Sequence, residues 1–165
     1  TIDVLKKMEE NIPSETIPIQ SEDLHYQVAR IYGDLDEKNL MKEIIEDLVA
    51  RKNGKPVNRV EYANTFYQEL GDPDKAIDIL EEMRSEFLQI ESILSIKGFD
   101  KNFISRRRWN QWQKAYPEVV NSLVYIYRKN DRNFDAEIVL SDWVLRNPKD
   151  TNAQEILEQI RSGKK

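Results

Sequence analysis

Apolar residues recur three and four positions apart along most of the chain, which is the spacing of amphipathic α-helices. The clearest example runs from Val60 to Met83, where Leu70-Gly71-Asp72-Pro73 interrupts the pattern. Glycine and proline break helices, so this stretch predicts two helices joined by a tight turn. A helix pair of this size cannot bury its own apolar face. It therefore needs similar pairs stacked against it.

The same spacing predicts helices on both sides of this pair. Ahead of it we expect a short helix over residues 1–11, an extended arm to residue 19, a helix capped by Ser21 that ends at 33–36, and a helix over residues 40–49. After it the apolar positions continue to Gly98, which predicts a second helix of about 24 residues, or ~36 Å. Pro117 is expected in the first turn of the next helix. A last helix is expected over residues 152–161.

Three copies of one pattern become visible when the chain is compared with itself. The second copy lies 35 residues after the first, and the third lies 60 residues after the second. The excess in the second interval indicates an insertion of about 26 residues relative to a period near 34, at residues 90–116. The aligned positions of the first two copies are Ala29, Tyr32, Met41, Ile45 and Leu48 over Asn64, Tyr67, Ala76, Leu80 and Met83; those of the third are Leu123, Val124, Tyr127, Ala136, Leu140 and Trp143, with Pro148 closing it.

These positions resemble the tetratricopeptide repeat (TPR) family, whose pattern has Tyr in the first helix, Ala and Leu in the second, and a closing Pro. The resemblance implies an all-α, TPR-like right-handed superhelical array. Larger residues stand at positions that are usually small, namely Asn64, Met83, Val124 and Trp143, and should re-angle the paired helices. The implied organisation is an N-terminal helix and arm at 1–20 and a helical domain at 21–165, with repeats at about 22–53, 57–89 and 117–149, the insertion at 90–116 and a cap helix at 151–162.

In this family the exposed residues of each first helix line a concave groove that binds another protein or a peptide. The family's clamp for peptide carboxylates has Lys and Asn where this chain has Tyr26 and Arg30, so that clamp is not expected here. Tyr26 and Tyr125 are large, rigid contact residues. The groove positions that the resemblance implies are Tyr26, Arg30, Glu61, Thr65, Gln68, Asn121, Tyr125 and Arg128, with Asp23 beside them.

A looser resemblance concerns the N-terminal string from Met8 through Asn11-Ile12-Pro13 to Ile17-Pro18-Ile19. It is similar to the soluble tails of some uncharacterised bacterial multi-pass membrane proteins, which implies a tail on the outer side of the inner membrane. The chain begins with Thr1 instead of Met, which suggests a segment of a longer protein. No run approaches the roughly 18 apolar residues of a membrane span, so this segment itself is not expected to cross one.

Composition narrows the chemistry. Hydrophobic residues make up 39% and charged residues 33%, as in a soluble helical protein. Cysteine is absent and His25 is the only histidine, which excludes disulfides, thiolate metal sites and multi-histidine sites. No phosphate loop or nucleophile motif accompanies the acidic pairs. We therefore expect no enzyme, no metal and no cofactor, and interpret His25 as a packing or groove residue.

One segment departs from the overall net charge of −5. Between Lys97 and Lys114 there are six cations and one anion, a local +5 that leaves −10 for the rest of the chain. Arg106, Arg107 and Arg108 could hold phosphates while a base stacks on Trp109 or Trp112, which would make the segment a site for RNA or for phosphorylated or acidic partners. Alternatively, the tryptophans and Phe103 pack onto the core and the arginines face water. The acidic surroundings disfavour nucleic acid and favour the second interpretation.

Overall fold

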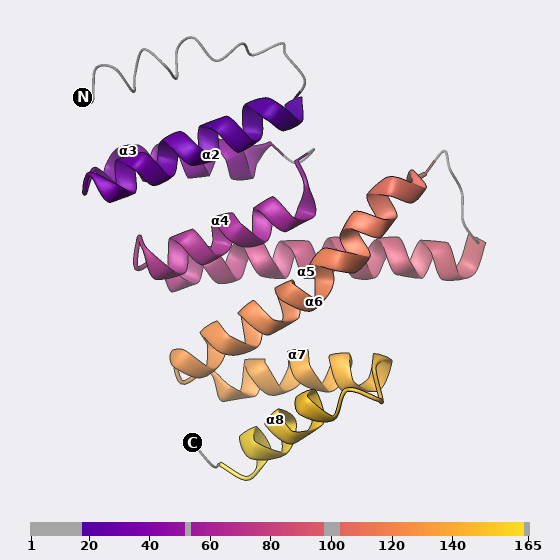
Figure 1. The fold of residues 1–165 in the computed structure, drawn as a ribbon. Coiled ribbons are helices and arrows are strands. Elements are labelled where there is room, and N and C mark those ends of the chain that lie inside the picture. Colours follow the sequence, from indigo (N-terminus) through magenta and orange to yellow (C-terminus); the bar gives the residue numbers. More distant parts are fainter. Residues whose placement is uncertain (1–17, 52–53, 98–102, 164–165) are drawn as a thin grey trace.

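The computed structural model describes residues 18–51, 54–97 and 103–163, which are helical throughout apart from short connections and contain no strand (Figure 1). The predicted all-α class is confirmed. The helix expected over residues 1–11 and most of the extended arm lie outside the described ranges. The helices are α2 (Pro18–Asp34), α3 (Lys38–Ala50), α4 (Pro56–Gln68), α5 (Pro73–Lys97), α6 (Arg106–Lys129), α7 (Asn133–Arg146) and α8 (Thr151–Arg161).

The helices form a stack of three antiparallel hairpins, α2–α3, α4–α5 and α6–α7, with α8 against the last hairpin (Figure 1). Contacts run from each layer to the next: α3 packs on α4, both α4 and α5 pack on α6, and α7 packs on α8. Alanines are fully buried in this stack, which lets helices approach closely. They are Ala29, Ala63, Ala76 and Ala136. No described helix combines the length and apolar character that a membrane crossing requires.

The three hairpin turns have one feature in common. Each contains a residue with a positive φ angle: Asp36 at 60°, Gly71 at 66° and Asp131 at 57°. These residues are 35 and 60 positions apart, which are the intervals between the three sequence copies. Backbone bonds repeat as well, since the N–H of Glu37 donates to Tyr32 O and the N–H of Arg132 to Tyr127 O, both at 2.9 Å. The first and third turns thus share this bond, whereas in the middle turn the N–H of Asp72 donates to Phe66 O at 2.8 Å. Glycine or aspartate occupies a left-handed position better than most residues.

The region expected as an insertion lengthens one helix pair. Residues 90–97 complete α5, and residues 106–116 are the first half of α6 (Figure 1). The prediction of a long second-repeat helix is confirmed, because α5 contains 25 residues. The expectation that Pro117 starts a helix is wrong, since α6 runs through it. Proline removes one helical hydrogen bond, but Trp112, Tyr116 and Val120 are buried on both sides of it and hold the helix together.

The start of the first described helix also differs from expectation. The helix α2 begins at Pro18, so Ser21 is inside it and does not cap it, and Pro18 and Ile19 are helical instead of extended. Proline is well suited to a first helical turn because its missing N–H would have no helical partner there. The ends of α2, α4 and α7 and the bounds of α3 and α8 agree with the sequence pattern to within a few residues.

Three aromatic rings join the long arms of α5 and α6, and we call them the aromatic seam: Phe87, Trp109 and Tyr116. The ring of Phe87 stacks on Tyr116 with centroids 3.8 Å apart, and on Trp109 at 5.2 Å. Tyr116 also contacts Trp143 of α7 at 5.9 Å. Stacked pairs of this kind add stability beyond the area they bury. The seam explains why the first half of α6 packs on α5.

A second, polar contact region lies near the starts of α2, α4 and α6. The side chain of Arg59 is only 1% exposed, and its guanidinium donates to both carboxylate oxygens of Glu86 at 2.9 Å and to Glu82 at 3.3 Å. The hydroxyl of Tyr62 donates to the buried carboxylate of Glu22 at 3.0 Å. Burial, reinforced by the negative charge of Glu22, raises the pKa of Tyr62. Buried charges are tolerated because each has a partner.

A side chain at position 54 would displace the carboxylate of Glu22. A Cβ atom on Gly54 would lie 2.4 Å from Oε1 of Glu22, a distance that no real contact allows. The carbonyl oxygen of Gly54 also accepts a hydrogen bond from the guanidinium of Arg108 on α6. The loop before α4 therefore connects the first hairpin to the extended start of α6.

Candidate binding groove

A groove of about 580 Å³ opens between α6 and α8, and we call it the α6–α8 groove. That volume is within the range of sites that hold a ligand or a short peptide segment. The second half of α6 forms one wall and α8 the other, while the beginning of α7 contributes to the floor. The side chains that determine its chemistry are Asn121, Val124, Tyr125, Arg128 and Lys129 from α6, and Asn152, Ile156 and Ile160 from α8.

The position of α8 is fixed by its N-cap, Asp150. Its carboxylate accepts the backbone N–H of Ala153 at 3.0 Å and Nε1–H of Trp143 at 2.9 Å. The bond from Trp143, with the backbone bond from Ala153, lowers the pKa of Asp150. A cap of this type satisfies amide groups at a helix start and favours a negative charge there. The carboxylate ties α8 to α7 and thereby sets the width of the groove.

The walls combine an apolar strip with two cations, Arg128 and Lys129, and two carboxylates, Asp131 and Asp150. Val124, Ile156 and Ile160 supply aliphatic surface, and the ring of Tyr125 is 51% exposed. The ammonium of Lys129 lies 5.8 Å from the centroid of the Tyr125 ring, within the range of a cation–π contact. Arg128 makes no ion pair with any residue that the structure describes. The groove therefore offers an aromatic contact beside charges of both signs, of which the Asp150 carboxylate is already bonded to Trp143 and Ala153.

Three of the groove residues expected from sequence line this groove: Asn121, Tyr125 and Arg128. The ring of Tyr125 also meets the edge of Tyr67 on α4, with centroids 5.9 Å apart. This contact continues the same face from α6 towards the second hairpin.

The remaining expected groove residues lie on α2 and α4 and do not converge on a cavity. The hydroxyl groups of Tyr26 and Thr65 are 3.1 Å apart, and the ring of Tyr26 packs on Tyr62 at 5.1 Å. Thr65 is buried, so it supports α2 against α4 instead of offering a contact to a partner. Burial raises the pKa of Tyr26. Arg30, Glu61 and Gln68 are exposed.

The basic and tryptophan-bearing segment does not present its groups on one surface. Trp112 is buried in the core, and the indole of Trp109 stacks on Phe87. The guanidinium of Arg108 donates to Gly54 O, and burial, with the nearby charge of Arg59, lowers its pKa. Arg106 and Arg107 are exposed. The suggestion that a base stacks on Trp112 is therefore wrong, because no face of that indole is accessible.

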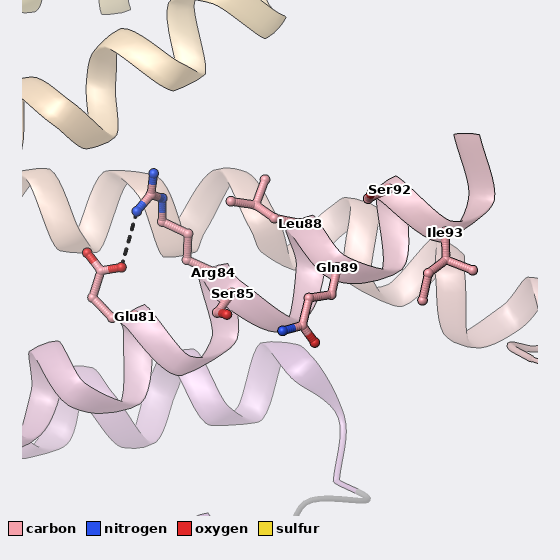
Figure 2. Close-up of a pocket in the computed structure, with 7 residues that line it drawn as sticks. All are labelled: Glu81, Arg84, Ser85, Leu88, Gln89, Ser92 and Ile93. Atoms are coloured by element: carbon pink, nitrogen blue, oxygen red, sulfur yellow. Dashed lines mark hydrogen bonds and ion pairs between the residues drawn. The ribbon is translucent and has the colours of Figure 1, made fainter. Parts of the chain in front are cut away.

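A wider but shallower hollow, of about 680 Å³, runs along α5 (Figure 2). Seven residues of this one helix line it: Glu81, Arg84, Ser85, Leu88, Gln89, Ser92 and Ile93. The guanidinium of Arg84 pairs with Glu81 at 3.2 Å and lies 3.8 Å from Asp142. Figure 2 shows these side chains spread along the helix instead of converging. Groups from a single helix, whose two charged side chains are already paired, form a weaker site than the α6–α8 groove.

His25 lines a small pocket of about 200 Å³ between α2 and α3, together with Tyr32, Glu43, Asp47 and Arg51. The carboxylate of Asp47 is paired with Arg51. The volume is below that of common small-molecule sites. Within the described ranges no group of three or more His, Cys, Asp or Glu side chains is arranged to hold a metal ion.

Sequence reasoning missed the contribution of α8 to the groove. Ile156 and Ile160 follow the apolar spacing of this helix, and both are half-buried on the groove wall. One signal in the sequence could have indicated this contribution. The last helix directly follows the third hairpin, and a helix that packs on α7 also faces α6. Comparison of the chain with models of known protein families, with curated proteins and with solved structures finds no match, so the functional argument rests on the geometry.

Proposed function

We propose that this chain is a TPR-like array that binds another protein noncatalytically, with a peptide segment of the partner held in the α6–α8 groove. The observation that carries the proposal is the half-exposed Tyr125, set between aliphatic side chains and the cations Arg128 and Lys129. The matched turn residues Asp36, Gly71 and Asp131 support a repeat architecture. In the right-handed superhelix that we propose, the first helix of each hairpin and α8 share the inner face.

The chemistry of the groove favours an extended segment that carries an apolar side chain next to an acidic one. The aliphatic strip and the Tyr125 ring would bury the apolar side chain. Arg128 would pair with the carboxylate, and the amides of Asn121 and Asn152 can both donate to and accept from a peptide backbone. Such a module acts as a scaffold, and we propose that it is part of a larger protein.

Titration with fluorescently labelled synthetic peptides, followed by anisotropy, tests this function. The peptides pair an apolar with an acidic residue, and the comparison set carries Lys in place of the acid. Tyr125→Ala should weaken binding by about tenfold or more, because a central aromatic contact contributes over ~1 kcal/mol. Arg128→Gln should reduce both the affinity and its salt dependence. Val57→Ala, which trims an exposed apolar residue of α4, is the matched control and should change nothing.

The alternative is binding of anionic ligands, such as RNA or a phosphorylated partner, through the exposed Arg106 and Arg107. It is less well supported because Trp112 is buried and Arg108 is engaged with Gly54. A labelled oligonucleotide in the same titration separates the two functions. The alternative would be favoured if the oligonucleotide binds in a salt-sensitive way. The double variant Arg106→Gln/Arg107→Gln should then abolish this binding, and Tyr125→Ala should leave it intact. Peptide binding that is indifferent to Tyr125→Ala would refute the groove.

A further inference from the structure

The outward face of α7 is apolar. Phe134 is 74% exposed, Ile138 is 47% exposed and Leu145 is 81% exposed. At 3.6 residues per turn these positions fall within about 40° of one another around the helix, so they form one stripe. We call this set the α7 stripe. None of its members lines the α6–α8 groove.

The same positions in the other hairpins are exposed but not comparably apolar. Sixty residues earlier, α5 has Asp74, Asp78 and Ser85, and 35 residues before those, α3 has Asn39, Glu43 and Ala50. All six are exposed, although each of these helices is followed by another hairpin. Stacking a further hairpin on the array would therefore leave the α7 stripe uncovered. Its large apolar residues serve neither the packing among residues 18–51, 54–97 and 103–163 nor the addition of a further hairpin.

Charged groups on both sides of the stripe are paired. Along one side, Arg132 bonds to Asp135 at 2.8 Å and Arg146 to Asp142 at 3.1 Å. On the other side, Arg161 of α8 donates to Glu137 at 2.8 Å and to Ser141 at 3.2 Å. An apolar stripe with paired charges at its rim has the composition of a protein interface. Because these charges are paired, the stripe carries no strong net charge that would repel an identical surface.

The arrangement is self-complementary. We propose that the α7 stripe packs against the α7 stripe of a second copy of this chain, with the two helices antiparallel about a two-fold axis. An axis that crosses α7 between Val139 and Leu140 pairs Phe134 with Leu145 of the second copy, and does so twice. It also places Ile138 against the small Ser141 of the second copy, which lets the helices approach closely.

The charges on the rim fit the same axis. Asp135 and Arg146 of the second copy are offset by two residues, which is ~3 Å of helix rise and within the reach of an arginine. Two such pairs form by symmetry, and each adds to the ion pairs that Arg146 makes with Asp142 and Glu91 and that Asp135 makes with Arg132 in its own chain. Three large side chains from each copy bury well under the ~800 Å² per partner of a standard interface, so the dimer is weak and depends on concentration.

Sedimentation equilibrium from micromolar to millimolar concentration tests the proposal. The wild-type chain should shift from monomer to dimer. The variant Phe134→Asp/Ile138→Asp/Leu145→Ser, which carries the residues of α5, should stay monomeric with an unchanged helical circular dichroism spectrum. Ile96→Ser is the matched control, because Ile96 is equally exposed on α5 and its loss should leave the dimer intact.

The absence of cysteine from the sequence gives an independent measurement. A single Ser141→Cys places a thiol beside the proposed axis, and a short bismaleimide should join two copies. Ser92→Cys, exposed on α5, is the control and should remain unjoined. A wild-type chain that is monomeric throughout, or cross-linking that is equal at both positions, overturns the proposal. Neither result bears on peptide binding in the α6–α8 groove.

Discussion

Replacing Phe87 by alanine is the most direct test of what holds the first half of α6 against α5. The ring of Phe87 is buried at the centre of the aromatic seam, between Tyr116 and Trp109. The substitution removes the contact that both of these α6 rings share on α5. It leaves every polar interaction of Phe87's helix in place, so its effect reports packing alone.

The expected loss follows from the packing. Truncating a buried phenylalanine to alanine costs about 3–5 kcal/mol, through lost transfer free energy and the cavity that remains. Two stacked partners place Phe87 in the upper part of that range, since each aromatic pair contributes about 0.5–1.5 kcal/mol beyond its area. Phe87→Leu keeps most of the volume and loses only the stacking, so we expect a cost of about 1–2 kcal/mol. A domain whose total stability is about 5–15 kcal/mol will show both losses.

Urea unfolding followed by far-ultraviolet circular dichroism measures the free energies. The matched control is Phe103→Ala, a phenylalanine at the start of the same arm that is half exposed and should change stability by less than about 0.5 kcal/mol. If Phe87→Ala costs no more than Phe103→Ala, the seam does not hold α6 to α5. The continuity of α6 through Pro117 would then need another cause.

Two further predictions concern buried polar groups. Arg59→Met keeps the apolar stem of the side chain but leaves Glu82 and Glu86 without their cation. These carboxylates are 40% and 32% exposed and regain water, so we expect a loss of about 1–3 kcal/mol in urea unfolding, less than for a fully buried pair. Burial, with the carboxylates of Glu22 and Glu81, raises the pKa values of Tyr62 and Tyr127 above 10.0, so the folded state keeps phenolic protons that the unfolded state loses. The contribution of these two tyrosines to stability should therefore be constant below about pH 10. It should fall as the pH rises beyond that value, in step with the absorbance of tyrosinate.

Each of these two has a control. Adding Glu86→Gln to Arg59→Met should recover part of the loss, because it removes one of the two like charges that face each other a turn apart. Additive losses would contradict the ion-pair explanation. For the tyrosines, Tyr62→Phe/Tyr127→Phe should flatten the decline above pH 10. Reversible ionisation of both phenols near pH 10 in the folded protein would show that burial and the neighbouring carboxylates do not raise their pKa values.

The helices could be predicted from sequence because their boundaries depend on local signals. The turn at Gly71 and Pro73 and the length of α5 follow from residues that are close together in the chain. Pro117 misled the prediction because a local rule was overridden by the packing of Tyr116 on Phe87, 29 positions earlier. Tertiary contacts of this kind leave no trace in a periodic pattern.

The groove was predictable only in part for the same reason. Helical spacing places Asn121, Tyr125 and Arg128 on one face of α6, as expected. Thr65 has the same local pattern but is buried because Tyr26, 39 residues away, covers it. The buried Arg59 could not be recognised either, since its partners are 23 and 27 residues away on α5. Whether these side chains are buried depends on which helices pack against one another, and the spacing of apolar residues does not show this.

The distribution of tryptophan has a practical consequence. The three indoles of the sequence are Trp109, Trp112 and Trp143, all on α6 and α7 and in or beside the aromatic seam. Tryptophan fluorescence therefore reports unfolding of the later part of the stack and responds little to unfolding of α2 and α3. Far-ultraviolet circular dichroism, in contrast, reports the helix content of the whole chain. In an array where each layer contacts only its neighbours, the two signals need not change together. Their difference would measure how strongly the first hairpin is coupled to the rest.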